Sequence, residues 1–329
     1  MRRAILIVLV TLIVGASVLY FLYVQDIAKA RALVAGQSQT IETRFGKLEY
    51  AETGKGEPVL SIHGSGGGFD QGLGMTGRLA DGYRLIAPSR FGYLRSSYPS
   101  NPTVAMQADA FAELLDKLGV KDAIVFGGSA GALSATEFAV RYPDRCRALV
   151  LLVPAAYAPT RKPNTGGADS PLAQFLIEAM LSSDFVFWMG TRFFPDTMTK
   201  TILATDPALV RAADANEQAR VRAVLDHILP VSTRAQGLLF DGRTAGAPGP
   251  QALEQITCPV LTISAKDDFY GTADPAEFIA GHVRNGRAVV YPTGGHLWVG
   301  HEDDVWHEIR AFLTAVDGNA ERKSASPGV

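Results

Sequence analysis

The chain has 329 residues, of which 47% are hydrophobic and 19% charged, and its formal net charge at pH 7 is −2. This charge is too small to create the positive field that attracts nucleic acid, so we expect no nucleic-acid partner. The two cysteines, Cys146 and Cys258, lie far apart and have no Cys/His spacing typical of zinc sites, so the sequence does not indicate a structural metal.

Residues 4–24 form an uncharged, almost wholly apolar run that is long enough to cross a bilayer as a helix. Arg2 and Arg3 precede it and favour a cytoplasmic N-terminus, with the main domain outside the cytoplasm. A cleaved signal peptide and a secreted protein are the alternative, because Ala28-Lys29-Ala30 resembles a cleavage site. The run exceeds the usual signal core of about 7–15 residues, so we predict a retained single-pass membrane anchor over residues 1–30.

A polar spacer over residues 31–40 precedes short apolar runs that are rich in β-branched residues and typical of buried parallel strands. These predicted strands cover residues 59–62, 84–87, 123–126, 148–153, 260–264 and 288–291. Amphipathic helical patterns at 105–118 and 130–142 separate some of them. Such alternation predicts an α/β fold with a doubly wound, mostly parallel sheet.

The alternation stops in the middle of the chain, where helical patterns at 172–189 and 209–229 lie between Pro- and Gly-rich pieces. We predict a helical lid over residues 155–255, inserted between core segments 41–154 and 256–318. Its aromatic residues either pack the lid onto the core or line an apolar pocket, and they are Phe175, Phe185, Phe187, Trp188, Phe193 and Phe194. Residues 319–329 are predicted to be a disordered tail.

The first chemical signal is Gly127-Gly128-Ser129-Ala130-Gly131, which follows the strand at 123–126 and begins the next helix. A sharp strand-to-helix turn exposes the serine oxygen, and the glycines let the neighbouring backbone approach closely. The helix N-terminus adds amide groups and positive potential where an oxyanion would form. Ser129 is therefore the predicted nucleophile, with an idle serine in a plain glycine turn as the alternative.

The second signal is His63-Gly64-Ser65-Gly66-Gly67-Gly68, directly after the strand at 59–62. Its exposed N–H groups could form an oxyanion hole with the N–H of Ala130; we choose Ser65 as the second donor and Gly66 as the next candidate. The loop lacks the Lys and Ser/Thr of a nucleotide-binding P-loop. His63 is expected to hold the loop rather than to act as a base.

A base and an orienting carboxylate follow Ser129 in the order that a serine nucleophile requires. The strand at 260–264 leads to Asp267 and Asp268, and the strand at 288–291 leads to Gly294-Gly295-His296. His296 is the predicted general base. From the residues alone, either acid could orient it.

The motifs GGSAG, HGSGGG, AKDD and GGH, in this order, resemble the α/β-hydrolase superfamily over residues 41–313. This resemblance implies a serine hydrolase with a helical lid, no metal or organic cofactor, and a small apolar acyl compound, such as a carboxylic ester, as substrate. It selects Asp268, three residues after Ala265, as the triad acid. Ser89 stands where members often have an acid. Ser129 disfavours the members that attack through aspartate, such as haloalkane dehalogenases and epoxide hydrolases.

The resemblance leaves other activities open. HGSGGG is similar to the oxyanion loop of meta-cleavage C–C hydrolases, and GGS to proline iminopeptidases, while a non-catalytic membrane-tethered binding protein is a further alternative. The oligomeric state is not indicated. The resembled fold would also place Cys146 and Cys258 before adjacent parallel strands, so they are either two buried thiols or, in an oxidising compartment, a disulfide.

Overall fold

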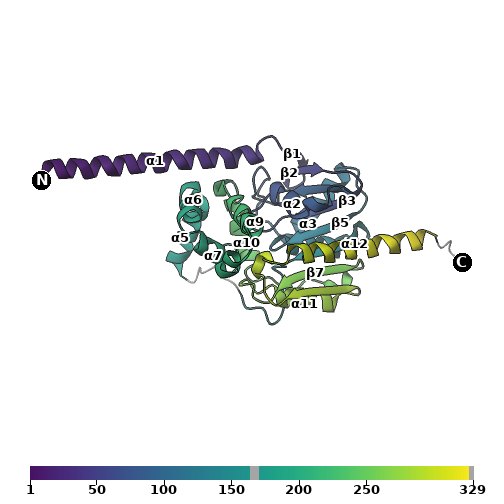
Figure 1. Ribbon diagram of the computed structural model, residues 1–329. Coiled ribbons are helices and arrows are strands. Elements are labelled where there is room, and N and C mark those ends of the chain that lie inside the picture. Colours follow the sequence, from purple (N-terminus) through teal and green to yellow (C-terminus); the bar gives the residue numbers. More distant parts are fainter. Residues whose placement is uncertain (164–169, 326–329) are drawn as a thin grey trace.

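The computed structural model describes residues 1–163 and 170–325. Its centre is an eight-stranded sheet in the order β1-β2-β4-β3-β5-β6-β7-β8, which confirms the predicted α/β fold (Figure 1). The strands are β1 (Gln39–Thr43), β2 (Gly46–Thr53), β3 (Glu57–Ile62), β4 (Tyr83–Pro88), β5 (Ala123–Gly128), β6 (Cys146–Leu152), β7 (Val260–Ala265) and β8 (Gly286–Tyr291).

Strands β3 to β8 pair in parallel, whereas β1 pairs with β2, and β2 with β4, in antiparallel fashion. All six predicted strands lie in the parallel part. The sequence analysis did not identify β1 and β2, because these strands alternate polar and apolar residues instead of forming apolar runs. The sheet therefore has an antiparallel edge that the apolar pattern did not reveal.

Helices cover both faces of the sheet, as a doubly wound fold requires. Side chains of α3 (Val104–Lys117), α4 (Gly131–Arg141) and α11 (Ala273–His282) pack into the core on one face. Those of α12 (Glu302–Ala325) pack on the other, and α2 (Phe69–Thr76) lies over β2 and β4. The described helix α12 continues to Ala325, so the predicted disorder is wrong for residues 319–325. Ala, Glu, Arg and Lys favour helix there. Residues 326–329 of the predicted tail lie outside the described residues.

The segment between β6 and β7, which we call the insertion (residues 155–255), is helical in its described part. Its helices are α5 (Pro171–Ser182), α6 (Asp184–Phe193), α7 (Pro195–Thr201), α8 (Pro207–Ala212), α9 (Ala215–Asp226) and α10 (Ala235–Thr244). Each predicted long helix is divided in two. Ser183 caps α6 by accepting a bond from the Val186 N–H, and Asp214 caps α9 through the Glu217 N–H. These caps begin a new helix where the apolar pattern continues unbroken.

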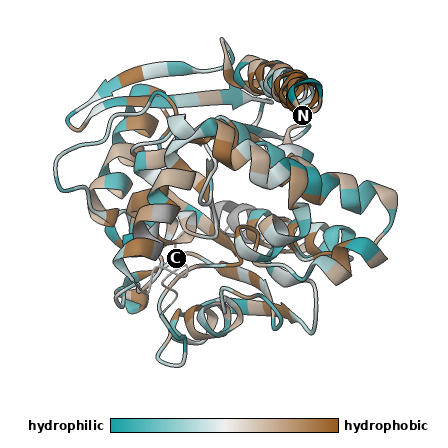
Figure 2. Cartoon of the chain, turned by 90° about the vertical axis from the view of Figure 1, so that its left-hand side faces the viewer, coloured by the Kyte–Doolittle hydropathy of each residue, from teal (hydrophilic) through white to brown (hydrophobic). Residues whose placement is uncertain are grey.

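Helix α1 (Arg2–Val34) projects from the body and is long and apolar enough to cross a membrane, with a mean hydropathy of 2.8 in an 18-residue window that is not buried. Figure 2 shows this helix end-on and mostly in the colours of apolar residues. Residues 31–34, predicted to be spacer, belong to the helix. The reason is local packing, because Ile27 and Ala30 are buried against the insertion and extend the helix beyond the apolar run.

The two cysteines lie at the N-terminal ends of the neighbouring strands β6 and β7. Cys146 begins β6, Cys258 precedes β7, and their sulfur atoms are 3.4 Å apart. Both are buried free thiols. Burial and the neighbouring Cys258 raise the pKa of the Cys146 thiol well above its ordinary value, so it stays protonated at neutral pH.

Candidate active site

Ser129 lies in the sharp turn between β5 and α4. Its φ of +48° is in the left-handed region, and its N–H donates to the Leu152 carbonyl at 2.8 Å. The flanking glycines are required sterically: a Cβ on Gly131 would lie 2.3 Å from the His63 carbonyl oxygen, and one on Gly127 would lie 2.5 Å from Ala135 Cβ. The turn therefore fixes the Ser129 side chain at the carboxyl edge of the sheet.

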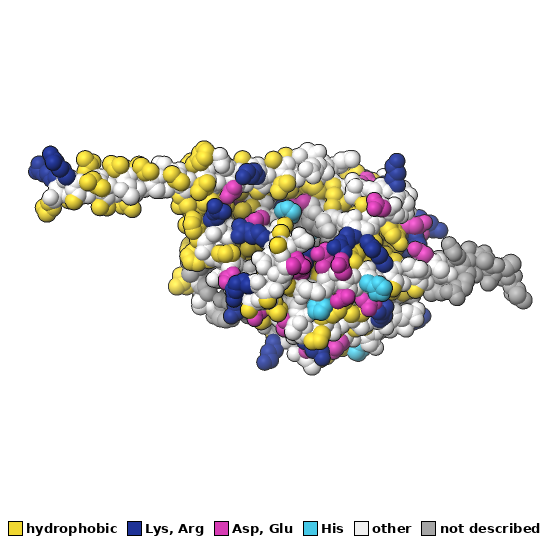
Figure 3. All heavy atoms as spheres, viewed as in Figure 1, with side chains coloured by type: hydrophobic (Ala, Val, Ile, Leu, Met, Phe, Trp, Pro, Cys, Tyr) yellow, Lys and Arg dark blue, Asp and Glu magenta, His cyan; other side chains and the backbone are white. Residues whose placement is uncertain are grey.

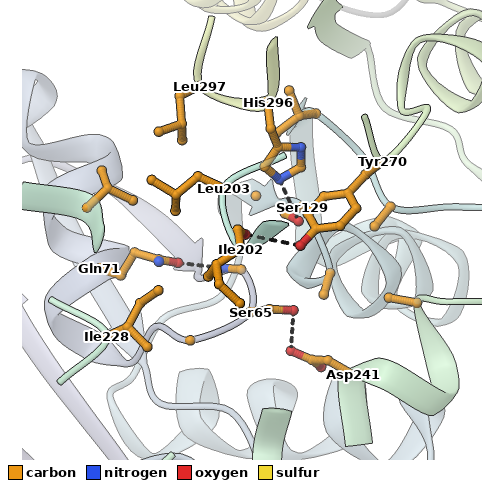
Figure 4. A pocket seen from close by; sticks show the side chains of 18 of the residues that line it. Ser65, Gln71, Ser129, Ile202, Leu203, Ile228, Asp241, Tyr270, His296 and Leu297 are labelled. Atoms are coloured by element: carbon orange, nitrogen blue, oxygen red, sulfur yellow. Dashed lines mark hydrogen bonds between the residues drawn. The ribbon is translucent and has the colours of Figure 1, made fainter. Parts of the chain in front are cut away.

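Three side chains from separate loops form one hydrogen-bonded row. His296 Nε2 lies 2.9 Å from Ser129 Oγ (Figure 4), and His296 Nδ1 lies 2.8 Å from Asp268 Oδ2. Asp268 follows β7 and His296 follows β8, so parallel strands bring both to the edge where β5 ends. With hydrogen on Nδ1, the ring donates to the carboxylate and accepts from the serine hydroxyl.

Asp268 is buried, yet its surroundings favour the charged form. Burial raises the pKa of its carboxyl, but the His296 ring and hydrogen bonds from His296, the Thr272 hydroxyl and the Tyr270 N–H lower it by more. The resulting pKa lies below the ordinary value, so Asp268 is a carboxylate at neutral pH. Burial, and then the charge of Asp268, raise the pKa of Tyr270 to about 12.

The neighbouring acid, Asp267, has a different set of contacts. Its carboxylate accepts from the N–H groups of Gly294 and Gly295 at 3.2 and 2.8 Å. Both glycines have positive φ, and a Cβ on Gly295 would lie 2.7 Å from the Thr205 side chain. Asp267 thus binds the backbone of the loop that carries His296, while Asp268 binds the imidazole ring. The sequence could not distinguish these two roles, because the two acids are adjacent.

The amides of Ser65 and Ala130 both border the pocket beside Ser129. Within the described residues, neither N–H has a hydrogen-bond partner. The N–H of Gly66, the other candidate donor, instead donates to the Tyr93 hydroxyl oxygen at 3.4 Å. Ser65 and Ala130 therefore each keep an unengaged amide beside the pocket that Ser129 also lines.

His63 holds the start of the glycine-rich loop from inside the protein. Its Nε2 accepts from the Arg90 N–H at 2.9 Å, and its Nδ1 lies 2.7 Å from the Gly64 carbonyl oxygen. Burial, and then the Arg90 charge, lower the pKa of His63 well below its ordinary value, so the ring is neutral. Both ring nitrogens of His63 thus contact backbone groups.

Charged side chains of the insertion bind the same glycine-rich loop from the other side. Asp241 of α10 is buried and accepts from Arg90 through both nitrogens at 2.7 and 2.6 Å, from the Tyr93 hydroxyl at 2.5 Å, and from Ser65 Oγ at 2.8 Å. Figure 4 shows the Ser65–Asp241 bond at the edge of the pocket. Sequence reasoning missed Asp241, because a carboxylate in a helix ordinarily faces water.

Arg234, just before α10, is a second such contact. It is fully buried, pairs with Asp70 at 2.9 and 3.2 Å, and donates to the Gly67 carbonyl. Two ends of the loop, at Ser65 and at Gly67, are thus held by α10 and the residue before it. The sequence carries no local signal for this pairing, because the partners lie more than 160 residues apart.

Ser89, at the position where an acid is frequent in the resembled superfamily, is part of a different network. Its hydroxyl accepts from the Phe69 N–H at 3.0 Å and donates to Glu49 at 2.8 Å. Glu49 on β2 is buried and also pairs with Arg95 at 2.7 Å. The carboxylate in this region therefore comes from a neighbouring strand.

Ser129 and His296 line a cavity of about 950 Å³ between the sheet and the insertion. Its walls are largely apolar and include Ile177, Leu181, Ile202, Leu203, Val224 and Ile228. Of the six aromatics predicted for the insertion, Phe187 lines the cavity and Trp188 is buried, whereas the other four are exposed. The described residues contain no group of three or more His, Cys, Asp or Glu side chains that could hold a metal.

The sequence of this chain matches a known protein family. Residues 57–300 match the alpha/beta hydrolase fold family. An uncharacterized hydrolase of Bacillus subtilis, YcgS, is 27% identical over 277 residues, which cover 80% of this chain and 93% of the relative. The chain covers less than half the length of the next curated relatives that it matches.

Solved structures with the same fold support this family membership. An alpha/beta hydrolase fold protein from Nakamurella multipartita has a TM-score of 0.66 and 27% identity, with 85% of this chain and 99% of that chain covered. The crystal structure of a membrane phospholipase A, described as a bacterial virulence factor, has a TM-score of 0.64 and 22% identity, covering 96% and 99%, and shows the shared fold. By sequence and fold, this chain belongs to the alpha/beta hydrolase fold family and is a hydrolase.

Proposed function

We propose that this hydrolase is a membrane-anchored serine esterase that cleaves apolar carboxylic esters through an acyl-enzyme. The observation that carries the proposal is the Ser129–His296–Asp268 row at the base of a large apolar cavity. The base is within hydrogen-bonding distance of both the nucleophile and the orienting acid, the arrangement that serine hydrolysis requires. In this proposal the insertion is the lid of the cavity.

Acylation begins when Ser129 Oγ attacks the ester carbonyl carbon and His296 Nε2 takes the hydroxyl proton. The Asp268 carboxylate stabilises the imidazolium through Nδ1–H. The amides of Ser65 and Ala130 bind the oxyanion of the tetrahedral intermediate. When the intermediate collapses, His296 gives its proton to the leaving alcohol, and the acyl group remains on Ser129.

Deacylation repeats these steps with water as the nucleophile. His296 removes a proton from water, the resulting hydroxide adds to the acyl carbon, and the same two amides bind the second oxyanion. Collapse returns the proton to Ser129 Oγ and releases the carboxylic acid.

The cavity supports a substrate with a bulky apolar acyl group. A volume of about 950 Å³ exceeds what a short acyl chain fills, and most of the exposed wall is apolar. Each buried methylene of an acyl chain contributes about 0.8 kcal/mol to binding. We therefore expect kcat/KM to rise with acyl length from C4 to at least C8.

The test combines active-site labelling with a substrate panel. The full chain should react with a fluorophosphonate probe, and Ser129→Ala should abolish labelling and lower kcat by on the order of 10⁵-fold or more. Ser100→Ala, an exposed serine outside the cavity, is the matched control. Labelling that persists in Ser129→Ala would contradict the proposal. Faster turnover of a vinylogous diketone or a prolyl amide than of any p-nitrophenyl ester would replace esterase with C–C hydrolase or peptidase.

Contacts of α1 with the insertion support a retained anchor. The Trp188 indole N–H donates to Asp26 at 3.0 Å, Arg31 pairs with Asp184 at 3.5 Å, and Ala30, in the candidate cleavage site, is buried. Cleavage after Ala30 would remove Asp26 and leave the buried Trp188 indole N–H without this acceptor.

The anchor is tested by fractionation and mass. The protein should stay in membranes washed with alkaline carbonate and keep residues 1–30 by intact mass. In spheroplasts, external protease should digest the catalytic domain, as the N-terminal Arg2 and Arg3 predict. A soluble product that begins near residue 31 would show cleavage instead.

A further inference from the structure

An apolar face on the insertion is largely exposed in the described structure. After α1, seven large apolar side chains of the described residues are exposed, and six of them belong to α5, α6 and the residue that follows α6. We call these six the apolar face: Leu172, Phe175, Phe185, Val186, Phe193 and Phe194, which are between 38% and 67% exposed. Such a concentration on one end of a protein marks a contact surface.

The apolar face lies beside the place where α1 meets the body (Figures 1 and 3). The Tyr23 ring packs edge-on against Phe185, with centroids 5.2 Å apart, and against Trp188 at 5.7 Å. Figure 3 shows hydrophobic side chains along the projecting part of α1 and on the adjoining end of the body. The two apolar surfaces are therefore continuous.

The length of α1 sets the depth of this contact in a bilayer. Residues 4–24 extend for about 32 Å as a helix, close to the roughly 30 Å of a hydrocarbon core. The hydrocarbon then ends near Val24, and Tyr23 lies in the interfacial layer that aromatic side chains prefer. Because Phe185 contacts Tyr23, the apolar face lies at the same depth.

We propose that the apolar face docks into the interfacial layer of the bilayer that α1 spans, so that the insertion lies on the membrane. This inference rests on the retained anchor of the proposed function and adds an orientation to it. The Asp26–Trp188 and Arg31–Asp184 contacts hold α1 against α6, which prevents the body from turning this face away from the lipid. Exposed Arg192, next to Phe193, can reach lipid phosphates.

Docking would give substrate a short path from lipid to the cavity. Helix α5 carries Phe175 on the apolar face, and two and six residues later it lines the cavity with Ile177 and Leu181. The substrate class that this arrangement favours is an acyl ester dissolved in the membrane.

Depth-dependent quenching tests the orientation. The full chain is reconstituted in phosphatidylethanolamine/phosphatidylglycerol vesicles with a nitrobenzoxadiazole label on one introduced cysteine, since Cys146 and Cys258 are buried. Phe175→Cys and Phe194→Cys should be quenched by shallow doxyl-labelled lipids. Arg284→Cys, exposed after α11, should not, and Val18→Cys within α1 should be quenched by deep ones.

The outcomes separate the two proposals. If Val18→Cys is quenched while labels at 175 and 194 behave like the label at 284, docking is wrong and the anchor stands. If Val18→Cys is not quenched, both are wrong. Labels at 175 and 194 that are shielded from water but unquenched by lipid would show a protein on this face and overturn docking.

Kinetics gives a second readout. The double variant Phe175→Ser/Phe194→Ser should lower kcat/KM for an ester dissolved in the vesicles by at least about tenfold, because two interfacial aromatic contacts are lost. Its kcat/KM for soluble p-nitrophenyl butyrate should stay unchanged, because neither residue lines the cavity. Equal activity of the variant and the parent on both substrates would contradict docking.

Discussion

The two ends of the insertion are held by different forces. At the α10 end, Asp241 and Arg234 are buried in ion pairs with the core and bind the loop that contains Ser65. At the α5–α6 end, apolar side chains are exposed and the nearest partner is α1. Charged hydrogen bonds are directional and fix atoms, whereas apolar contact is not directional and fixes only a surface. The difference teaches that buried ion pairs fix the insertion against the glycine-rich loop, whereas its α5–α6 end leaves apolar side chains exposed to other surfaces.

Among the substitutions that test this contrast, Asp241→Asn should have the largest effect on stability and activity. The change leaves Arg90 buried without a charged partner and weakens the hold on Ser65, so the free energy of unfolding should fall by about 3–5 kcal/mol. The kcat for p-nitrophenyl butyrate should fall by on the order of 10²-fold, the usual cost of misplacing an oxyanion donor. Steady-state kinetics and denaturant unfolding of the full chain measure both effects.

Asp226→Asn is the control, because Asp226 of α9 is solvent-exposed in its pair with Arg222. It should change unfolding by less than about 1 kcal/mol. A kcat for Asp241→Asn that equals the parent value would show that Ser65 does not depend on α10.

Arg234→Met is next in size. Asp70 remains partly solvated, so we expect a loss of about 2–3 kcal/mol in the free energy of unfolding. Since Arg234 and Asp241 hold one loop, the double variant should deviate from additivity by at least 0.5 kcal/mol. Additive losses would mean that the two contacts stabilise separate parts of the protein.

Trp188→Phe addresses the junction with α1. It removes one hydrogen bond to a partly exposed carboxylate and part of a buried ring, so the full chain in detergent should lose more than about 1 kcal/mol. Asp26→Ala removes only the hydrogen bond and should lose about 1 kcal/mol, and the double variant should lose no more than Trp188→Phe alone. Fully additive losses would show that this bond does not form.

The smallest effect is expected on the apolar face itself. Phe194→Ala should change the free energy of unfolding in detergent by less than about 0.5 kcal/mol, because the side chain has few protein contacts to lose. Phe187→Ala in the neighbouring α6 is the matched control: Phe187 is fully buried, so about 3–5 kcal/mol should be lost. Similar losses for both would show that Phe194 packs within the protein.

The residues of the proposed triad could be predicted from sequence because of where they lie along the chain. Ser129, Asp268 and His296 each follow an apolar strand, and parallel strands must end at one edge of a sheet. The family and the parallel part of the fold followed from the same signals. The donor role of Ser65 and Ala130 stays a prediction, drawn from the amides that a glycine-rich loop and a helix start expose.

Contacts between distant polar residues were not predictable. Asp241 and Arg234 lie among ordinary polar helical residues, and only tertiary packing buries them against Arg90 and Asp70. Strands β1 and β2 were missed because charged and polar residues interrupt their apolar positions, even where β2 is buried. The exposure of Phe193 and Phe194 could not be predicted either. An aromatic residue gives the same sequence pattern whether protein or lipid covers its side chain.

The insertion leaves the sheet after β6 and returns at β7, two strands that are direct neighbours. Its exit and entry points are therefore adjacent, and the insertion could be exchanged for that of a relative without altering the sheet register. Such a chimera would need matching charges: an incoming insertion without an equivalent of Asp241 would strand the Arg90 guanidinium inside the protein. Modular replacement of substrate specificity in this enzyme is thus constrained by the buried ion pairs Arg90–Asp241 and Arg234–Asp70.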